Sequence, residues 1–461
     1  MFDQLMGRVA GRFARVEPRR RATALVLGLL SDLPRKNCWT LAEHAGDATP
    51  DGMQHLLHRA KWDADAVRDD VRAYVVDHLA DDQAVLVVDE TGDLKKGTAT
   101  VGVQRQYTGT AGRIENAQVA VYLVYSAPQG HASIDRALYV PRSWTEDPDR
   151  CCSAGIPDDL AFATKPQLAA RMVERALDAG TPARWVAGDE VYGDNPHLRI
   201  TLERRRTGYV LAVSSTHTIT THAGKFQAKA LAARIPRRAW QRLSAGTGAK
   251  GERYYDWAQV DIHDPAGRPD HWYLLVRRNR RTGELAFYRC FSPRPVPLSE
   301  LVQVAGRRWT IEETFQAGKG LTGLDEHQVR RWTSWHRWVT LAMLAHAFLA
   351  VTAATERRDR PALDGLIPLT GNEIQHLFAA LTSPVTTSYT ACAGHTGDAD
   401  TKPAPEPATT NGKQLPSRRG WCPLTGGDNE MSRGQCRCIL PHRGNHDRRA
   451  AAPSIRTGRR G

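Results

Sequence analysis

The stretch that decides the fold is residues 84–97, which read AVLVVDETGDLKKG. Its first five residues form a short, continuous apolar run, the pattern of a buried strand, and this run leads into Asp89. A second run of this kind, within residues 185–195 (WVAGDEVYGDN), leads into Asp189. Catalytic groups collect at the carboxyl ends of strands in α/β sheets, although a lone Asp at a strand end is usually an N-cap or turn residue. The two runs therefore predict an α/β sheet with an acidic pair at one edge.

A third acidic residue lies in a predicted helix, residues 307–319 (RRWTIEETFQAGK). At about 100° per residue, Arg308, Glu312 and Lys319 share one face of this helix, and Glu313 is rotated away from it. An ordinary salt-bridged surface helix gives the same spacing. Aromatic residues flank the segment and a strongly apolar helix follows it, so we expect the region to be packed rather than solvated.

The chain of 461 residues exceeds what one hydrophobic core usually serves, so we expect several domains. The hydrophobic pattern along the chain changes from helical to alternating α/β, then to a period of two, and then back to helical. The chain ends in a tail rich in Pro, Gly, Thr and Arg. Within the first segment, residues 39–61 have a helix-turn-helix-like pattern, which any small helical bundle also produces. The predicted divisions are residues 1–80 (helical), 81–214 (α/β core), 215–293 (β-rich insertion), 294–380 (C-terminal helices of the core) and 381–461 (disordered tail).

These motifs together carry a family resemblance. DETG-x-LKKG, GDEVYG and R-x3-E-x6-K, with residues 103–116 and AFATK at 161–165, resemble insertion-sequence transposases of the DDE superfamily, in the branch with a β-rich insertion. The resemblance covers roughly residues 5–375. One departure is Ala305, where the wider superfamily signature has Tyr. The resemblance implies an α/β fold, an RNase H-like catalytic core interrupted by the insertion, with a helical N-terminal DNA-binding region.

The resemblance also implies the site. Asp89, Asp189 and Glu312 correspond to the metal-binding catalytic triad, and Arg308 and Lys319 to its companions on the helix. Hard Mg²⁺ prefers carboxylate oxygens, so we expect two Mg²⁺ ions, replaceable by Mn²⁺, that promote phosphodiester cleavage and strand transfer. Two further candidates for contact with DNA phosphate, or ordinary surface lysines, are Lys95 and Lys96. Other acids near the triad, which we interpret as turn or supporting residues, are Glu90, Asp93, Glu190 and Asp194.

Charge and composition favour a nucleic-acid partner. The sequence has 63 Lys and Arg against 50 Asp and Glu, a net charge of +13. Such a surplus favours a polyanion through phosphate neutralisation, although a soluble protein with solvated basic faces has the same balance. We expect double-stranded DNA, both transposon ends and target, and a homodimer that joins two ends. The rival functions are a nuclease without strand transfer and an inactive or domesticated DNA-binding protein.

The sequence gives little sign of secretion or membrane insertion. The N-terminus lacks a signal-peptide pattern, and the longest apolar stretch, residues 339–354, is interrupted by His346 and reads as a buried helix. Eight cysteines are too few for a disulfide scaffold of this length, so we expect the cytoplasm of a bacterium, near the nucleoid.

Two further features have competing interpretations. Tryptophans in the insertion, which would stack on an unpaired base or form its core, are Trp240, Trp257 and Trp272. Tail residues whose spacing permits a zinc site, although an incidental origin is favoured, are Cys422, Cys436, Cys438, His442 and His446.

Overall fold

The computed structural model describes residues 1–248, 251–263, 267–359 and 367–382. The helical N-terminal part contains α1 (Phe2–Val9), α2 (Val16–Leu29), α3 (Cys38–His44), α4 (Asp51–His58) and α5 (Ala64–Leu79). The first part of the core contains β1 (Val85–Leu94), β2 (Gln104–Thr108), β3 (Arg113–Ala127), β4 (Gly130–Leu138), α6 (Arg142–Thr145), α7 (Pro148–Ala154), α8 (Lys165–Asp178), β5 (Trp185–Gly188), α9 (Glu190–Gly193), α10 (Pro196–Arg204) and β6 (Gly208–Val213).

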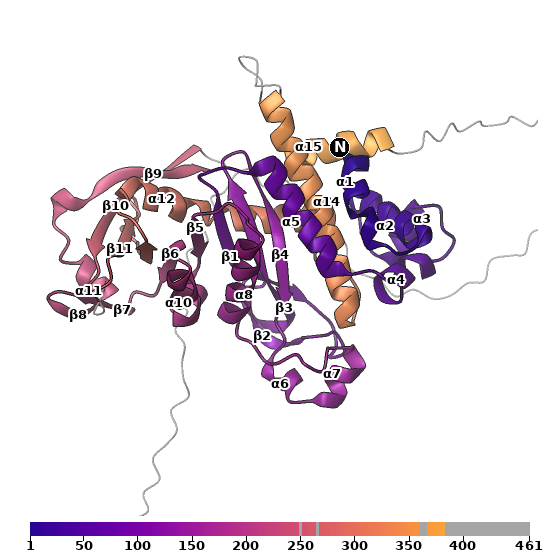
Figure 1. The fold of residues 1–461 in the computed structure, drawn as a ribbon, viewed down its shortest axis with the longest axis horizontal. Coiled ribbons are helices and arrows are strands. Elements are labelled where there is room, and N and C mark those ends of the chain that lie inside the picture. The colour runs from indigo at the N-terminus through magenta and orange to yellow at the C-terminus, as the bar shows by residue number, and fades with distance from the viewer. Residues whose placement is uncertain (249–250, 264–266, 360–366, 383–461) are drawn as a thin grey trace, which may run out of the picture. The chain divides into compact units, whose positions relative to one another are not determined.

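The second half of the chain is β-rich before it becomes helical again (Figure 1). The β-rich part contains β7 (Thr218–Thr221), β8 (Gly224–Gln227), α11 (Ala228–Ala232), β9 (Gln241–Gly248), β10 (Gly251–Asp261), β11 (His271–Arg278) and β12 (Leu285–Ser292). The final helices are α12 (Leu298–Arg307), α13 (Thr310–Thr322), α14 (Trp332–Asp359) and α15 (Gly371–Thr382).

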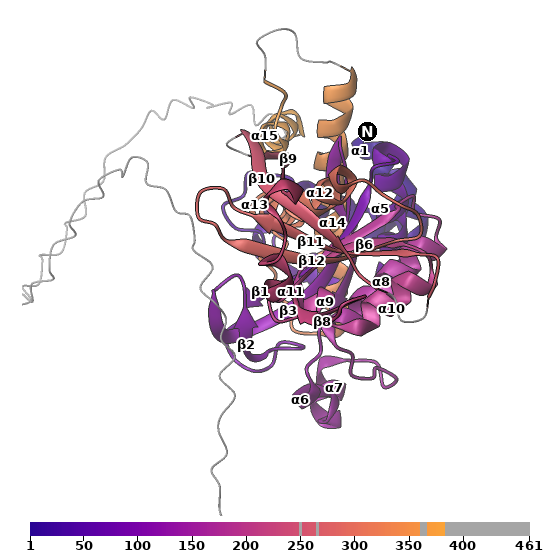
Figure 2. The ribbon, with the colours of Figure 1, turned by 90° about the vertical axis from the view of Figure 1, so that its left-hand side faces the viewer.

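A ten-stranded mixed sheet organises the described residues. Five of its strands lie in the order β4-β3-β1-β5-β6, in which β3 is antiparallel to β1 and to β4, while β5 and β6 run parallel to β1. This order and these directions form the expected RNase H-like core. The expected β-rich insertion is also present, and it extends the same sheet, because β12 pairs antiparallel with β6 and is followed by β11, β10 and β9 (Figure 2).

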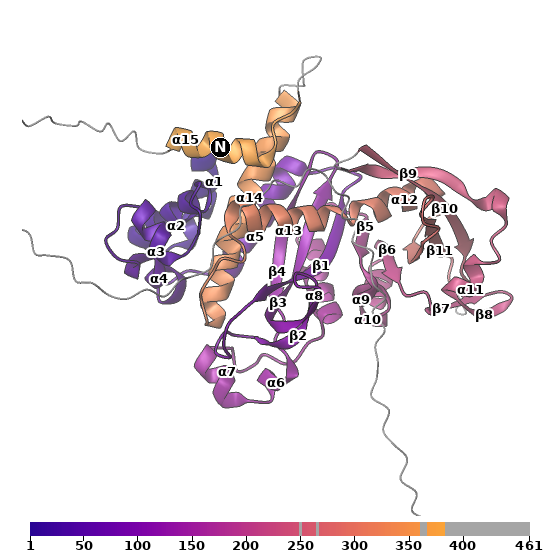
Figure 3. The ribbon, with the colours of Figure 1, turned by 180° about the vertical axis from the view of Figure 1, so that it is seen from behind.

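Helices cover both faces of the core sheet. On one face α5 and α8 pack against β3 and β4, and on the other face α12 and α13 cross β1 and β5, as the opposite views of Figures 1 and 3 show. Alternation along β1 explains the two layers, because Leu86 and Val88 point into one core and Val85 and Val87 into the other. Since Asp89 is next in this alternation, its side chain points toward the α12–α13 face.

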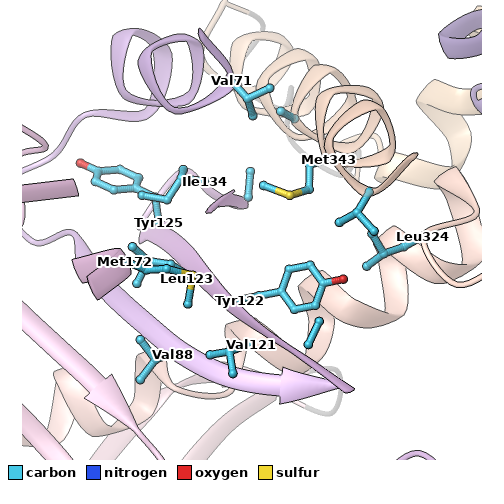
Figure 4. Close-up of a cluster of buried hydrophobic side chains, with 14 of the residues drawn as sticks. Val71, Val88, Val121, Tyr122, Leu123, Tyr125, Ile134, Met172, Leu324 and Met343 are labelled. Atoms are coloured by element: carbon cyan, nitrogen blue, oxygen red, sulfur yellow. The ribbon is translucent and has the colours of Figure 1, made fainter. Parts of the chain in front are cut away.

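The first of these cores joins strands to helices that are distant in sequence. Figure 4 shows Val88 of β1, Ile134 of β4, Val71 of α5, Met172 of α8 and Met343 of α14 within one cluster of buried side chains. Burying such side chains contributes about 1.5–3 kcal/mol each, so this cluster holds the helical N-terminal part against the sheet.

The long apolar helix α14 is a core helix, as the sequence predicted. By length and composition its 28 residues could cross a membrane, but most of them are buried inside the protein. It packs against α5, β4 and α13, and its buried Arg337 donates hydrogen bonds to backbone carbonyls of Leu56, Ala60 and Trp62. The apolar surface of α14 is thus covered by the N-terminal helices and by the sheet.

Candidate active site

The strand register brings the two predicted aspartates together. Val88 is paired with Gly188 in the last parallel pair between β1 and β5, and Asp89 and Asp189 follow directly. The expectation that Asp89 ends its strand is wrong, because β1 continues to Leu94 while paired with β3. β5 does end at Gly188, and the two strands separate beyond this pair. The aspartates therefore stand at a fork in the sheet.

Asp189 also has the ordinary structural role considered for it. Its carboxylate Oδ1 accepts a hydrogen bond of 2.9 Å from the backbone N–H of Val191 and so caps α9. The turn that follows is tight, because a Cβ atom on Gly193 would lie 1.9 Å from the carbonyl oxygen of Ala212. The final glycine of GDEVYG is thus required for the close approach of α9 to β6, which fixes the direction of the Asp189 side chain.

Arg308 connects the sheet to the helix that carries Glu312. Its guanidinium lies 2.8 Å from Glu312 Oε1 and 3.3 Å from Asp89 Oδ2. The predicted single helix is divided, since α12 ends at Arg307 and α13 begins at Thr310, but the four-residue spacing still places Arg308 beside Glu312. Glu313 points elsewhere, with its Oε2 at 3.5 Å from His131 Nε2.

The electrostatics of the fork indicate an excess of negative charge. Burial, and then the charge of Asp189, raise the pKa of Asp89 well above its ordinary value, although Arg308 opposes this. Burial, and then the charge of Glu90, raise the pKa of Asp189 to about 6. These carboxyl groups are therefore held close enough to disfavour simultaneous ionisation, which is the condition that a bound cation relieves.

Glu90 is held by residues from two other sequence motifs. Its two carboxylate oxygens lie 2.7 Å from the ammonium of Lys165 and 2.5 Å from the hydroxyl of Tyr192. Lys165 is the last residue of AFATK, and the buried Tyr192 belongs to GDEVYG. The sequence did not predict contacts among Glu90, Lys165 and Tyr192. The only indication in the sequence was that all three of their motifs are present.

The predicted phosphate-binding lysines lie in different surroundings. Lys319 lies 3.5 Å from Asp93 Oδ1 and 3.8 Å from Asp325 Oδ2, in an ionic cluster at the end of β1. In the same cluster, Lys95 Nζ donates a hydrogen bond to the backbone carbonyl of His327. Lys96, in contrast, is exposed to solvent. Of the three lysines, Lys96 is therefore the one whose side chain is open to solvent outside this ionic cluster.

The donor set at the fork suits a hard divalent cation in part. Asp89 and Asp189 supply carboxylate oxygens at a site where their charges repel. Glu312 is engaged by Arg308, and within the described ranges no group of three or more His, Cys, Asp or Glu side chains is already arranged to hold a metal ion. Two of the three expected ligands are thus adjacent, and the third would have to exchange or share its contact with Arg308.

The other predicted contacts have mixed outcomes. Trp257 and Trp272 are buried in the β-rich part, and Trp240 packs beneath the guanidinium of Arg278, so these side chains serve the core of the insertion rather than an open stacking surface. The proposed zinc ligands of the tail lie outside the described residues. In the N-terminal part, α4 is the second helix of the expected helix-turn-helix pattern. The exposed side chains on α4 and at its C-terminal end are Gln54, His55, His58 and Arg59.

An RNase H-like sheet with clustered acidic side chains at the β1–β5 fork defines a class of nucleic-acid-processing enzymes. Residues 8–278 match the family model described as DDE superfamily endonuclease, which covers more than half of the chain, and the chain belongs to this family. Enzymes of this superfamily use divalent metal ions. The match includes Asp89 and Asp189 but ends before Glu312.

A curated relative is more specific. Over 197 residues the chain is 30% identical to the probable transposase for insertion sequence element IS701 of Microchaete diplosiphon. The alignment covers 42% of this chain and 49% of the relative, so the chain spans about half the length of the protein it matches.

Proposed function

We propose that this protein is the transposase of an insertion sequence, which binds the terminal inverted repeats of its element, cleaves DNA there and joins the freed ends to target DNA. The observation that carries the proposal is the fork after the Val88–Gly188 pair, where Asp89 and Asp189 lie together while Arg308 reaches from α12–α13 to Asp89 and Glu312. The similarity to a probable insertion-sequence transposase supports the same reaction.

In this proposal Asp89, Asp189 and Glu312 hold Mg²⁺, or Mn²⁺ in its place. When bound, such ions activate water or a 3′-hydroxyl as the nucleophile and stabilise the departing oxygen. Arg308 orients the carboxylates of Asp89 and Glu312, and it provides a fixed positive charge where phosphate charge develops. Lys96 contacts the DNA backbone from the surface, and Lys319 positions the β1 end through Asp93.

The remaining parts of the chain have proposed roles of their own. Residues 1–80 recognise duplex DNA, residues 81–214 and 294–380 form the catalytic core, and residues 215–293 are an insertion within it. Two copies act together because two element ends must be joined. The protein acts in the cytoplasm, on the DNA of the nucleoid, and its affinity for DNA falls steeply with salt because phosphate contacts dominate.

Two neighbouring glutamates provide the test of the site. Glu312→Gln should lower Mg²⁺-dependent cleavage of a labelled terminal-repeat duplex by more than about 100-fold, with DNA affinity retained, because it removes a ligand and the partner of Arg308. Glu313→Gln is the matched control and should be mild, since Glu313 faces His131. Equal losses in the two variants would show that the assignment of the helix face is wrong.

The same assay separates the rival functions. A pre-cleaved duplex with a free 3′-hydroxyl should be joined to a target plasmid by the wild-type protein. Hydrolysis without joining would favour a nuclease. If Asp89→Asn left every measurable activity unchanged, the chain would be a non-catalytic DNA-binding protein.

A further inference from the structure

The β2–β3 hairpin exposes two large side chains beside each other. Tyr107 and Ile114 are directly opposite in the antiparallel register, and they are 53% and 60% exposed. Single apolar residues on a surface are ordinary, but a directly paired aromatic and aliphatic side chain forms a small continuous apolar surface. Within the described part of the chain, the adjacent Thr108 is almost fully buried, whereas Tyr107 and Ile114 are open to solvent.

The tip of this hairpin is held against β1, the strand that carries Asp89. Thr110 Oγ1 donates a hydrogen bond of 2.8 Å to the carbonyl of Gly92 and lies 3.4 Å from Thr91 Oγ1. Strands rise about 3.3 Å per residue, so three residues from Thr110 to Tyr107 and two from Thr91 to Asp89 keep Tyr107 within about 20 Å of Asp89. This is about six base pairs of duplex DNA, at about 3.4 Å for each nucleotide of a strand.

The surroundings and the size of the pair favour DNA over a second protein. Lys96, just beyond β1, and Arg105, on β2, are both exposed near the hairpin. The two apolar side chains offer roughly 200 Å² at most, whereas each partner in a stable protein interface contributes about 800 Å². Nucleic-acid bases suit so small an apolar surface, because one aromatic ring stacks on one base and one aliphatic side chain wedges into one base step.

We propose that Tyr107 and Ile114 form a wedge that contacts the bases of bound DNA within about six base pairs of the phosphate at Asp89. This inference rests on the proposed function and deepens it, because it names residues that read or open the DNA next to the cut. The exposed cations Lys96 and Arg105 hold the backbone on either side of the wedge. The wedge itself makes no contact with phosphate.

The test uses the full chain in EDTA and duplexes that match the element's terminal repeat, each with one 2-aminopurine. Wild-type protein should raise the fluorescence of one position within about six base pairs of the cut, because that base is unstacked. Tyr107→Ala should abolish the rise and weaken binding by about 5- to 100-fold. Tyr107→Phe should retain both properties, because the stacking ring remains, and thermal melting verifies that the variants are folded.

Salt dependence separates a base wedge from a phosphate contact. In Tyr107→Ala and Ile114→Ala the slope of log affinity against log salt concentration should be unchanged, whereas Lys96→Ala should reduce its magnitude by about 0.9. Ile200→Ala is the matched control, since Ile200 is a comparably exposed apolar residue on α10, and it should bind as the wild type does.

Wild-type affinity and fluorescence in both alanine variants would overturn the proposal. So would a loss of self-association in sedimentation with unchanged DNA binding, because the pair would then contact a second copy. The proposed function is tested independently by adding Mg²⁺. If the wild type unstacks the base but never cleaves, the proposed function fails and the wedge is retained. If the wild type cleaves without unstacking a base, the wedge fails and the proposed function is retained.

Discussion

Asp135 of β4 should be among the most stabilising charged residues of the protein. Its side chain is 1% exposed, and its carboxylate lies 2.8 Å from Arg175 of α8 and 3.3 Å from Arg68 of α5. The neighbouring Arg136, also 1% exposed, depends on Asp65 at 2.7 Å and on the charge of Asp135. Asp135 thus joins β4 to α5 and α8, the two helices that cover this face of the sheet.

Asp135→Asn should lower the free energy of unfolding by about 3 kcal/mol. Breaking one partner of a buried ion pair costs about 3–5 kcal/mol, because the remaining charge is buried without compensation. We take the lower end, since Arg175 is 40% exposed and Asn retains part of the hydrogen bonding. Urea unfolding at pH 7, followed by tryptophan fluorescence, measures the change. Asp77→Asn is the control, because Asp77 is 52% exposed and its pair with Arg8 should contribute no more than about 1 kcal/mol. Equal changes in the two variants would refute the reasoning.

Three further perturbations have outcomes that follow from named contacts. Burial lowers the pKa of His336 and of His346 to about 3. Below pH 6.5 the unfolded chain therefore binds more protons than the folded one, and the free energy of unfolding should fall as pH falls, by up to about 1.4 kcal/mol per pH unit for each histidine. Equal urea midpoints at pH 7 and pH 5 would contradict this. Lys165→Met should free the Glu90 carboxylate, so that Tb³⁺ binds more tightly, as its luminescence reports, while DNA cleavage slows. Weaker Tb³⁺ binding would mean that Lys165 only supports the fold. Gly193→Ala should lower the melting temperature by several degrees, because its Cβ would meet the Ala212 carbonyl, and an unchanged melting curve would show that the turn adapts freely.

The two strands that carry the aspartates were predictable, because short apolar runs specify buried strands. The runs at 84–88 and 185–187 identified β1 and β5, and the period of two after residue 250 identified β10, β11 and β12. The length of β1 was not predictable from its own residues. Polar residues from Glu90 onward remain in the strand because β3 pairs with them from one side, and this partner is more than twenty residues away in sequence.

Long-range pairing also explains the rest of what sequence missed. The β12–β6 pairing that attaches the insertion to the core sheet leaves no local pattern in either strand. Helical phase correctly put Arg308 beside Glu312 and turned Glu313 away, but it gave no sign that Asp93 and Asp325 would hold Lys319. Helical periodicity indicates which residues share a face of the helix. Tertiary packing decides which residues that face contacts.

Internal salt bridges balance only part of the negative charge at the fork. Four carboxylates gather there, those of Asp89, Glu90, Asp189 and Glu312, and two cationic side chains, Arg308 and Lys165, contact them. The formal excess is therefore two negative charges, which the raised pKa values of Asp89 and Asp189 express as a tendency to retain protons. One divalent cation balances this excess. In the proposed reaction an entering phosphodiester would add a further negative charge, which would favour a second cation. If the proposed function holds, the charge balance of the fork would therefore link binding of the second cation to binding of DNA.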